Sequence, residues 1–219
     1  MRLAVIGDVH VHMERLAVVL ARIREVGVDG VLQVGDLSRE VTPWRKDEAA
    51  HAAARVSAER VLDAIRGLGV PVLWVPGNHD PRDLDGPGNV DGTVEMLGPW
   101  AVHGIGGSGP ARFGFPYEWD EDDIRGRTLP PCDILVSHTP PARTRLDRTR
   151  RGQHVGSEAI RELAEGHSGL LVCGHIHEAP GVEMLGDCLC VNAGGLGEPY
   201  GAAQVAFVED LRTARLEVL

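Results

Sequence analysis

The sequence LAVIGDVH at residues 3–10 joins a short apolar run to an aspartate and a histidine. An apolar run that leads to an aspartate returns in GVLQVGD at residues 30–36 and, with a histidine as well, in VPVLWVPGNHD at residues 70–80. Short, continuous apolar runs of this kind indicate strands that are buried on both faces of a parallel sheet. The fold therefore depends on strands that each end in polar residues.

Helical patterns separate these three strands. Leu16, Val19, Leu20 and Ile23 follow the i, i+3, i+4, i+7 spacing of a helix that faces a core, and residues 54–68 repeat this spacing. The resulting order is strand, helix, strand, helix, strand. It predicts a parallel sheet with right-handed crossovers.

The second half of the chain has a different pattern. Residues 81–99 and 106–119 read as loops, because Gly and Pro interrupt them, and residues 154–165 read as a helix. Three further strands are expected at residues 100–105, 132–137 and 170–173. Short apolar runs at 182–185, 188–192, 204–208 and 215–219 have turns between them, which predicts an antiparallel meander. No repeat or linker divides the chain, so we expect a single domain over residues 1–219.

Length, charge and cysteine use limit the class of protein. The 219 residues, with a mass of 23.5 kDa, are sufficient for one core that buries roughly 70% of the unfolded surface. A net charge of −10 disfavours a protein that coats nucleic acid. No apolar run is long enough for a membrane span, and the N-terminal run is too short for a signal peptide. The cysteines form no CxxC pair and lie in apolar runs, which is typical of buried, reduced thiols in a cytoplasmic protein; they are Cys132, Cys173, Cys188 and Cys190.

Five polar motifs follow the expected strands and contain five of the ten histidines. They are Asp8-Val9-His10, Gly35-Asp36, Gly77-Asn78-His79-Asp80, His138 and Gly174-His175-Ile176-His177. Sites of parallel sheets form at the carboxyl ends of the strands, so we expect these motifs to meet at one edge. In extended backbone, residues i and i+2 point the same way, which would pair Asp8 with His10 and His175 with His177. Carboxylate, amide and imidazole groups without thiolate suit Mn, Fe, Zn or Ni.

The order DxH, GD, GNHD, H and GHxH resembles the motif set of the calcineurin-like metallophosphoesterase superfamily, and it extends from residue 8 to residue 177. The resemblance implies an α/β fold, a four-layer α/β/β/α sandwich in which helices flank two mixed β-sheets. It also implies a site with two divalent metal ions. Asp8, His10 and His177 would hold the first ion, Asn78, His138 and His175 the second, and Asp36 would bridge both. His79 would be the catalytic histidine, and Asp80 would fix the orientation of its ring.

The chemistry of such a site has a physical basis. Two cations roughly 3.5–4 Å apart neutralise a phosphate ester and hold the attacking and leaving oxygens of an in-line displacement. The resemblance therefore implies a dimetal-dependent phosphoesterase in which a metal-bridging hydroxide attacks in line. Mn is the favoured metal, and the expected substrate is a small phosphate ester, with nucleotides among the candidates.

Differences from the motifs of known subfamilies reduce the number of activities to consider. The segment Gly35-Asp36-Leu37-Ser38-Arg39-Glu40 lacks the GDxVDRG pattern of protein Ser/Thr phosphatases and symmetrical dinucleoside polyphosphate hydrolases. Arg39 stands where purple acid phosphatases have a metal-binding Tyr, and 219 residues leave no room for the DNA-binding extension of the related nucleases. The chain is similar instead to small bacterial and archaeal phosphodiesterases. A phosphomonoesterase, a nucleotide pyrophosphatase and an inactive metal-binding scaffold subunit stay open as alternatives.

Three features near the motifs have two interpretations each. The arginines of residues 143–151 could clamp a phosphate, or they could form a solvated loop with partners such as Asp147. The four aromatic residues of segment 113–119 could stack a nucleobase, or they could form a local core or a subunit contact, which leaves a homodimer open. His12 and His103 could line the pocket or only neighbour it. We expect no stable nucleic-acid complex and no membrane partner.

Overall fold

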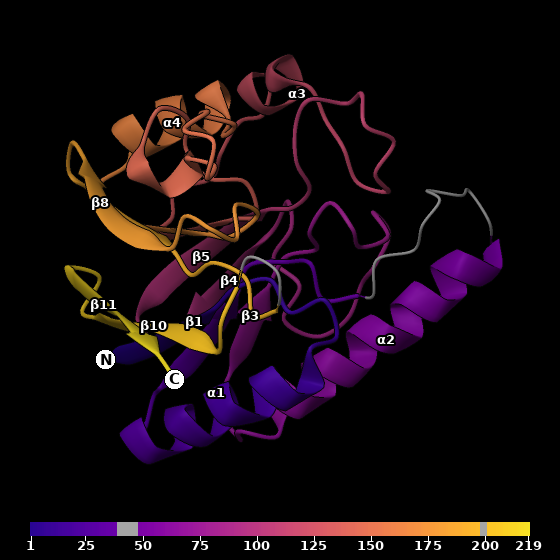
Figure 1. Cartoon of the computed structure of the whole chain (residues 1–219). Coiled ribbons are helices and arrows are strands. Elements are labelled where there is room, and N and C mark those ends of the chain that lie inside the picture. Colours follow the sequence, from indigo (N-terminus) through magenta and orange to yellow (C-terminus); the bar gives the residue numbers. More distant parts are fainter. Residues whose placement is uncertain (39–47, 198–200) are drawn as a thin grey trace.

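The computed structural model describes residues 1–38, 48–197 and 201–219 (Figure 1). Arg39 and Glu40 lie outside the described residues. The helices and strands, in chain order, are β1 (Arg2–Ile6), α1 (Met13–Val26), β2 (Gly30–Gln33), α2 (Glu48–Arg66), β3 (Val72–Trp74), β4 (Val94–Leu97), β5 (Trp100–Ile105), α3 (Glu121–Arg125), β6 (Ile134–Ser137), the 3-10 helix η1 (Arg145–Asp147), α4 (Glu158–Glu165), β7 (Leu170–Cys173), β8 (Gly181–Leu185), β9 (Cys188–Asn192), β10 (Gln204–Glu209) and β11 (Thr213–Val218).

The first sheet contains both ends of the chain. Its strand order is β11-β10-β1-β2-β3, with β1, β2 and β3 parallel and β10 antiparallel to both β1 and β11. Alternate residues of β1 enter different cores: Ala4 packs toward the helices and Val5 toward the second sheet. Burial on both faces explains the continuous apolar runs of these strands.

The second sheet is also mixed. Its strand order is β4-β5-β6-β7-β9-β8, in which β5, β6, β7 and β9 are parallel and the two edge strands β4 and β8 are antiparallel to their neighbours.

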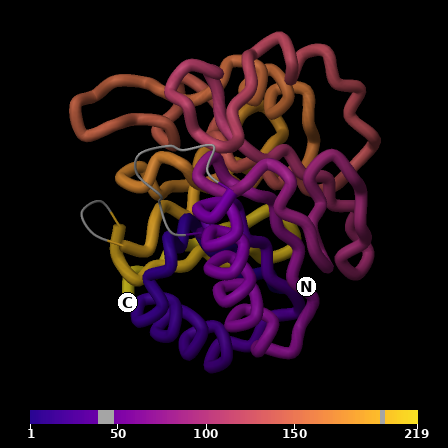
Figure 2. The backbone as a smooth tube through the Cα atoms, turned by 90° about the vertical axis from the view of Figure 1, so that its right-hand side faces the viewer, coloured from indigo at the N-terminus to yellow at the C-terminus, as the bar shows by residue number. Residues whose placement is uncertain are grey.

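Three apolar clusters hold the layers together. The first joins α1 and α2 to the first sheet, the second lies between the two sheets, and the third joins the second sheet to α3 and α4. Both views show α1 and α2 on the opposite side of the molecule from α3 and α4 (Figures 1 and 2). The four-layer α/β/β/α sandwich with two mixed sheets is therefore confirmed.

Local boundaries differ from the prediction at three places. The segment expected to be a loop at residues 81–99 contains β4, an exposed edge strand in which only Leu97 is buried, so it lacks the apolar alternation that marks a strand. Helix α4 begins at Glu158 rather than at His154, because the Ser157 hydroxyl caps it by accepting from the Ile160 N–H. The short helix α3 was not predicted.

The predicted C-terminal meander is wrong in one respect, because its two halves belong to different sheets. The hairpin of β8 and β9 extends the second sheet, whereas the hairpin of β10 and β11 joins β1 in the first. A local apolar pattern identifies hairpins but does not say which sheet receives them. The second hairpin thereby ties the C-terminal segment to the strand that carries Asp8.

The cysteines lie in and around the second sheet. Cys173, Cys188 and Cys190 are buried, whereas Cys132 is half-buried and precedes β6. The Cys188 and Cys190 sulfurs lie 3.8 Å apart on one face of β9. Among the described residues, no helix is both long enough and apolar enough to cross a membrane.

Candidate metal centre

The five motifs meet where the carboxyl ends of strands from the first sheet face those of strands from the second sheet. Asp8 follows β1, Asp36 follows β2, and Asn78 follows β3, all in the first sheet. His138 follows β6, and the motif with His175 and His177 follows β7, both in the second sheet. We expected a single edge, but the motifs meet across two.

Four of the candidate ligands form one compact group. Asp8, His10, Asp36 and His177 each offer a ligand atom, and these atoms all lie within 4.8 Å of one another. His177 Nε2 lies 2.8 Å from Asp8 Oδ2, and His10 Nε2 lies 3.4 Å from Asp36 Oδ2. These are the three residues expected at the first metal position, together with the expected bridge.

The other three candidates lie close to one another, and one of them approaches Asp36. His138 Nε2 is 3.6 Å from Asp36 Oδ2 and 2.8 Å from Asn78 Oδ1. The rings of His138 and His175 are 5.0 Å apart between centroids. Asp36 Oδ2 thus lies within 3.6 Å of one histidine from each set of candidates, as expected of a bridging carboxylate.

The donor pattern at His138 fits a cation. Its Nδ1 lies 2.8 Å from the Val34 carbonyl oxygen, which can only accept, so Nδ1 carries the proton in the neutral ring. Nε2 then presents a lone pair toward Asn78 Oδ1, which is also an acceptor. On the other side of Asp36, His10 Nε2 and His177 Nε2 approach to 3.3 Å. Nitrogen and oxygen atoms that converge in this way could hold a divalent cation once each imidazole presents an unprotonated nitrogen to it.

Buried polar atoms of the same residues lack hydrogen bonds. Within the described part of the chain, Asp8 Oδ1 and Asn78 Nδ2 are buried without a hydrogen-bond partner. Leaving a buried polar atom unsatisfied costs about 1–3 kcal/mol. The second oxygen, Asp8 Oδ2, accepts from the His175 backbone N–H at 2.8 Å, so the carboxylate is held in place while Oδ1 stays available. The residues present therefore fit the two metal positions that the motif set implies.

The backbone is turned sharply at the candidate ligands. His10, Asp36 and His175 have φ values of +43°, +51° and +64°, in the left-handed region. We predicted that an extended backbone would point Asp8 and His10 the same way, and His175 and His177 likewise. This explanation is wrong, because His10 and His175 lie in left-handed turns. Residues that are held in this region cluster at functional sites.

Two glycines allow the loops to approach the carboxylates. A Cβ on Gly77 would collide with the Asp36 carboxylate and backbone N, and a Cβ on Gly174 would collide with Asp8 Oδ1. The glycines of the GNHD and GHxH motifs are therefore needed for close approach rather than for flexibility.

The electrostatics favour ionised carboxylates beside imidazoles. Burial alone would raise the pKa of Asp36, but His138, His79 and His10 hold it well below its usual range. Burial and the neighbouring His138 lower the pKa of His175 to about 3, which keeps this ring neutral. Burial would also lower the pKa of His177, but its hydrogen bond to Asp8 and the charge of that carboxylate raise it to about 9.

His79 lies at the mouth of the site, and Asp80 lies behind it. His79 Nε2 is 3.9 Å from Asp36 Oδ2, its side chain is 15% exposed, and its backbone N–H donates to Asp36 Oδ1. The oxygens of the fully buried Asp80 accept from three backbone N–H groups, those of Leu37, Ser38 and Gly77. These bonds fix the loop after β2 against the loop after β3. The role of Asp80 in fixing the orientation of the His79 ring stays a prediction.

The arginine-rich loop does not use Asp147 as an arginine partner. Arg143 pairs with Glu158 at 2.5 Å, and Arg145 lies 3.6 Å from Glu183. The buried Asp147 carboxylate accepts instead from backbone N–H groups and lies 2.7 Å from His154 Nδ1. Both paired arginines are exposed, so they belong to the solvated interpretation of the loop.

The aromatic segment 113–119 divides into two parts. Tyr117 and Trp119 are buried: the Tyr117 hydroxyl donates to Asp91 Oδ2 at 2.7 Å, and Trp119 Nε1 donates to the Gly106 carbonyl at 2.8 Å. Phe115 instead contacts the His79 ring at 4.7 Å between centroids, and Phe113 is 55% exposed. The sequence reasoning missed the contact of Phe115 with His79. The clustering of the four aromatic residues was its only signal.

The remaining histidines of interest are neighbours of the site. His103 is buried in β5, with Nδ1 2.7 Å from the Thr93 carbonyl oxygen, so it points away from the candidate ligands. His12 precedes α1, and its ring lies against Gly197.

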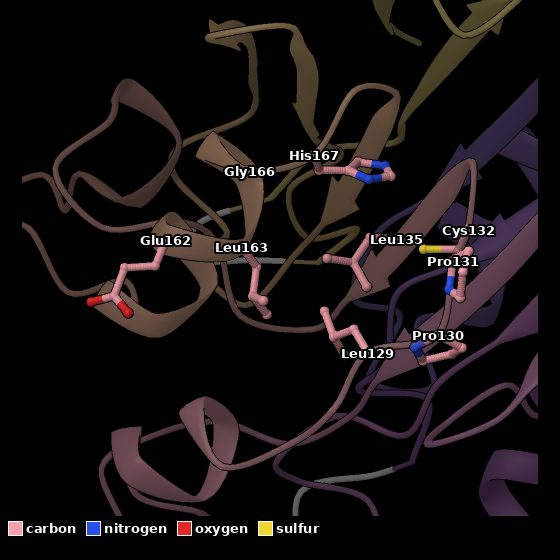
Figure 3. A pocket seen from close by; sticks show the side chains of 9 residues that line it. All are labelled: Leu129, Pro130, Pro131, Cys132, Leu135, Glu162, Leu163, Gly166 and His167. Carbon is pink, nitrogen blue, oxygen red and sulfur yellow. The ribbon is translucent and has the colours of Figure 1, made fainter.

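A separate pocket of about 330 Å³ lies beside α4 (Figure 3). Its lining is mostly apolar, with Leu129, Leu135 and Leu163 facing one another and the Cys132 thiol at one side (Figure 3). None of the candidate ligands lines this pocket.

Comparison with known protein families shows which family has this fold and these motifs. The model of the calcineurin-like phosphoesterases matches residues 1–179. The chain belongs to the calcineurin-like phosphoesterase family. Within the curated proteins, it is 32% identical over 136 residues to the uncharacterized protein MJ1162 of Methanocaldococcus jannaschii. That match covers 55% of this chain and 62% of the relative, so the chain spans less than two thirds of the relative's length.

Solved structures of this calcineurin-like phosphoesterase fold align over nearly the whole chain. The protein TT1561 of Thermus thermophilus has a TM-score of 0.66 at 20% identity, with 99% of this chain and 98% of that chain covered. A dimetal phosphatase from Danio rerio has a TM-score of 0.59 at 12% identity, with 100% and 98% covered. A structure described as a novel archaeal phosphodiesterase has a TM-score of 0.57 at 14% identity, with both chains fully covered. At these identities, the likeness concerns the fold.

Proposed function

We propose that this chain is a dimetal phosphodiesterase whose single domain spans residues 1–219. The observation that carries the proposal is the convergence of six candidate ligands from both sheets around a seventh, Asp36. Asp8, His10 and His177 would hold one ion, Asn78, His138 and His175 the other, and Asp36 would bridge them. Nitrogen and oxygen ligands suit Mn, Fe, Zn or Ni, of which we favour Mn.

Different residues of the chain would have different roles around these ions. Two divalent ions would neutralise the bound phosphate and make hydroxide available near neutral pH for in-line attack. Asp36 stays ionised, because its low pKa keeps the proton off the bridging position. His79, which is partly exposed beside Asp36, is placed to hold a proton at Nε2 for the leaving oxygen. Asp80 supports this arrangement by tying the two loops together.

The charge of the site supports a diester as substrate. Within the described residues, the ion pairs of the site join histidines to aspartates, and no Arg or Lys contributes to them. A diester carries one negative charge, whereas a monoester carries close to two near neutral pH. Among the described side chains, positive charge at the phosphate would come from the histidines and the two proposed ions, which suffices for the single charge of a diester. The full-length fold match to the archaeal phosphodiesterase is consistent with this choice.

The proposed substrate is a small phosphate ester, with nucleotides among the candidates. A net charge of −10 disfavours a stable complex with nucleic acid, because phosphate binding there depends on Lys and Arg. We place the protein in the cytoplasm on the basis of its free cysteines, Cys173, Cys188 and Cys190 among them. A homodimer is compatible with this proposal but does not carry it.

The direct test is hydrolysis of bis-p-nitrophenyl phosphate by the Mn²⁺-loaded protein, with and without a chelator. We expect turnover that the chelator abolishes and that Asp36→Asn reduces strongly. The matched control is Asp187→Asn, which removes an exposed carboxylate in the turn between β8 and β9. Preference for monoesters would replace the proposal with a phosphomonoesterase, and preference for nucleotide anhydrides with a pyrophosphatase. A loaded protein that is inert toward all three classes would be a metal-binding scaffold.

A further inference from the structure

Two phenylalanine rings lead outward from His79 to the surface. Phe115 and His79 lie 4.7 Å apart between ring centroids, and Phe113 lies 6.2 Å from Phe115. Phe113 is 55% exposed, although full burial of a Phe side chain stabilises a protein by about 1.5–3 kcal/mol. An exposed aromatic ring that continues a ring contact at the proposed catalytic histidine calls for a function.

The loop that carries these rings is held rigidly. Phe113 and Gly114 donate their backbone N–H groups to the Glu118 carboxylate at 3.1 and 3.0 Å. The Tyr117 backbone N–H donates to the Asn78 carbonyl at 3.3 Å, which ties the loop to the GNHD motif itself. These hydrogen bonds tie the backbone beside Phe115 to Glu118 and to the GNHD motif.

The charge beside the outer ring selects among aromatic ligands. The Arg112 guanidinium lies over one face of the Phe113 ring, with its carbon 5.0 Å from the ring centroid, so a base would stack on the other face of the ring. A cation next to an aromatic ring favours a ligand that combines a flat ring with negative charge. A nucleotide has both, whereas an alkyl phosphate lacks the ring and a neutral aromatic compound lacks the charge.

We infer that Phe113, continued inward by Phe115, is a stacking subsite for the nucleobase of the ester whose phosphate is cleaved beside His79. This inference rests on the proposed function and names its substrate class as nucleoside phosphodiesters. The base binds on the leaving-group side, because His79 is the group placed to protonate the leaving oxygen. Hydrolysis then breaks the bond between phosphorus and the nucleoside oxygen, and water supplies the hydroxyl of the phosphate and the proton of the alcohol.

A matched pair of diesters tests this subsite. Adenosine 5′-methyl phosphate and ribose 5-methyl phosphate carry the same ester and differ in the base. Stacking of a base on an aromatic side chain is worth about 5- to 150-fold in binding. We expect the Mn²⁺-loaded protein to show a higher kcat/KM for the adenosine ester by a factor in this range, and we expect Phe113→Ser to remove most of that ratio. Phe113→Trp should preserve it, and Phe113→Leu should lower it, because leucine keeps the apolar surface but not the ring.

A control variant and a second measurement distinguish failure of the stacking subsite from failure of the proposed phosphodiesterase function. Met96→Ser, which removes another exposed apolar side chain from β4, should leave the ratio between the two esters unchanged. Saturation-transfer NMR with adenosine 5′-monophosphate requires no turnover, and it should show contact at the adenine protons that Phe113→Ser abolishes. Equal kcat/KM values for the two diesters, or adenine contact that persists in Phe113→Ser, would overturn the subsite and leave the phosphodiesterase intact. Adenine contact that depends on Phe113, with neither ester hydrolysed, would support the subsite and refute the proposed function.

Discussion

Gly77→Ala isolates the close approach that holds the bridging carboxylate. The added Cβ would lie 2.7 Å from Asp36 Cγ and closer still to the Asp36 carboxylate oxygen and backbone N, and real Cβ contacts essentially never fall under 3.0 Å. Gly77 does not have a positive φ, so alanine is compatible with its backbone and the collision is the whole perturbation. Because Asp36 is fully buried between the two ligand sets, it cannot move aside without leaving one of them.

The magnitude follows from the packing. Forcing extra atoms into a well-packed site costs about 1–3 kcal/mol, which corresponds to a drop in Tm of about 2–12 °C for a chain of this size. The larger effect is expected on metal binding, because the displaced carboxylate is the ligand that we propose both ions share. We expect calorimetric titration with Mn²⁺ to show the loss of at least one of two sites, and turnover to fall with it.

Gly166→Ala is the matched control for this prediction. Gly166 ends α4 with an ordinary φ of −88°, and a Cβ there would meet its nearest atom at 3.6 Å, an ordinary van der Waals distance. It should keep the Tm and both metal sites. Two Mn²⁺ ions bound to Gly77→Ala with unchanged affinity would refute the argument that this glycine positions the bridge.

Three further predictions follow from the same geometry. His79→Ala should keep both metal ions by elemental analysis while kcat falls by about 10²- to 10⁴-fold, the usual contribution of a general acid; loss of metal would instead make His79 a ligand. Asp80→Ala should lower the free energy of unfolding by at least about 3 kcal/mol in denaturant titrations, because three buried backbone N–H groups lose their acceptor. The control Asp85→Ala, which removes an exposed carboxylate, should leave this free energy unchanged. An unchanged unfolding midpoint for Asp80→Ala would show that the loops do not depend on this carboxylate. Metal loading should release about one proton from His177 near pH 7, because Asp8 raises the pKa of that ring to about 9 in the metal-free protein and a metal ligand must be unprotonated. Calorimetry in buffers of different ionisation enthalpy should show that this proton release vanishes above about pH 9. Proton release that does not change with pH would contradict this assignment.

The apolar strands and the positions of the motifs were predictable because both are local. The runs that became β1, β2 and β3 are buried on both faces, and polar residues directly after such strands reach a common edge. Strand β4 was missed because Val94, Glu95 and Met96 are exposed, so burial left no pattern in the sequence.

The parts that were wrong or missed depend on contacts between distant segments. The donors to Asp80 belong to the loop after β2 and to Gly77, and a motif cannot show which of its neighbours a carboxylate binds. The contact between Phe115 and His79 joins residues of different loops. The assignment of the two C-terminal hairpins to different sheets likewise follows from tertiary packing rather than from their own residues.

The central claim is that seven side chains from two sheets hold two metal ions with Asp36 between them. A crystal structure of the Mn²⁺-loaded protein, with anomalous scattering recorded for manganese, tests it most directly. We expect two anomalous peaks on either side of the Asp36 carboxylate, one against Asp8, His10 and His177 and the other against Asn78, His138 and His175. A single peak, or peaks that do not share Asp36, would contradict the claim.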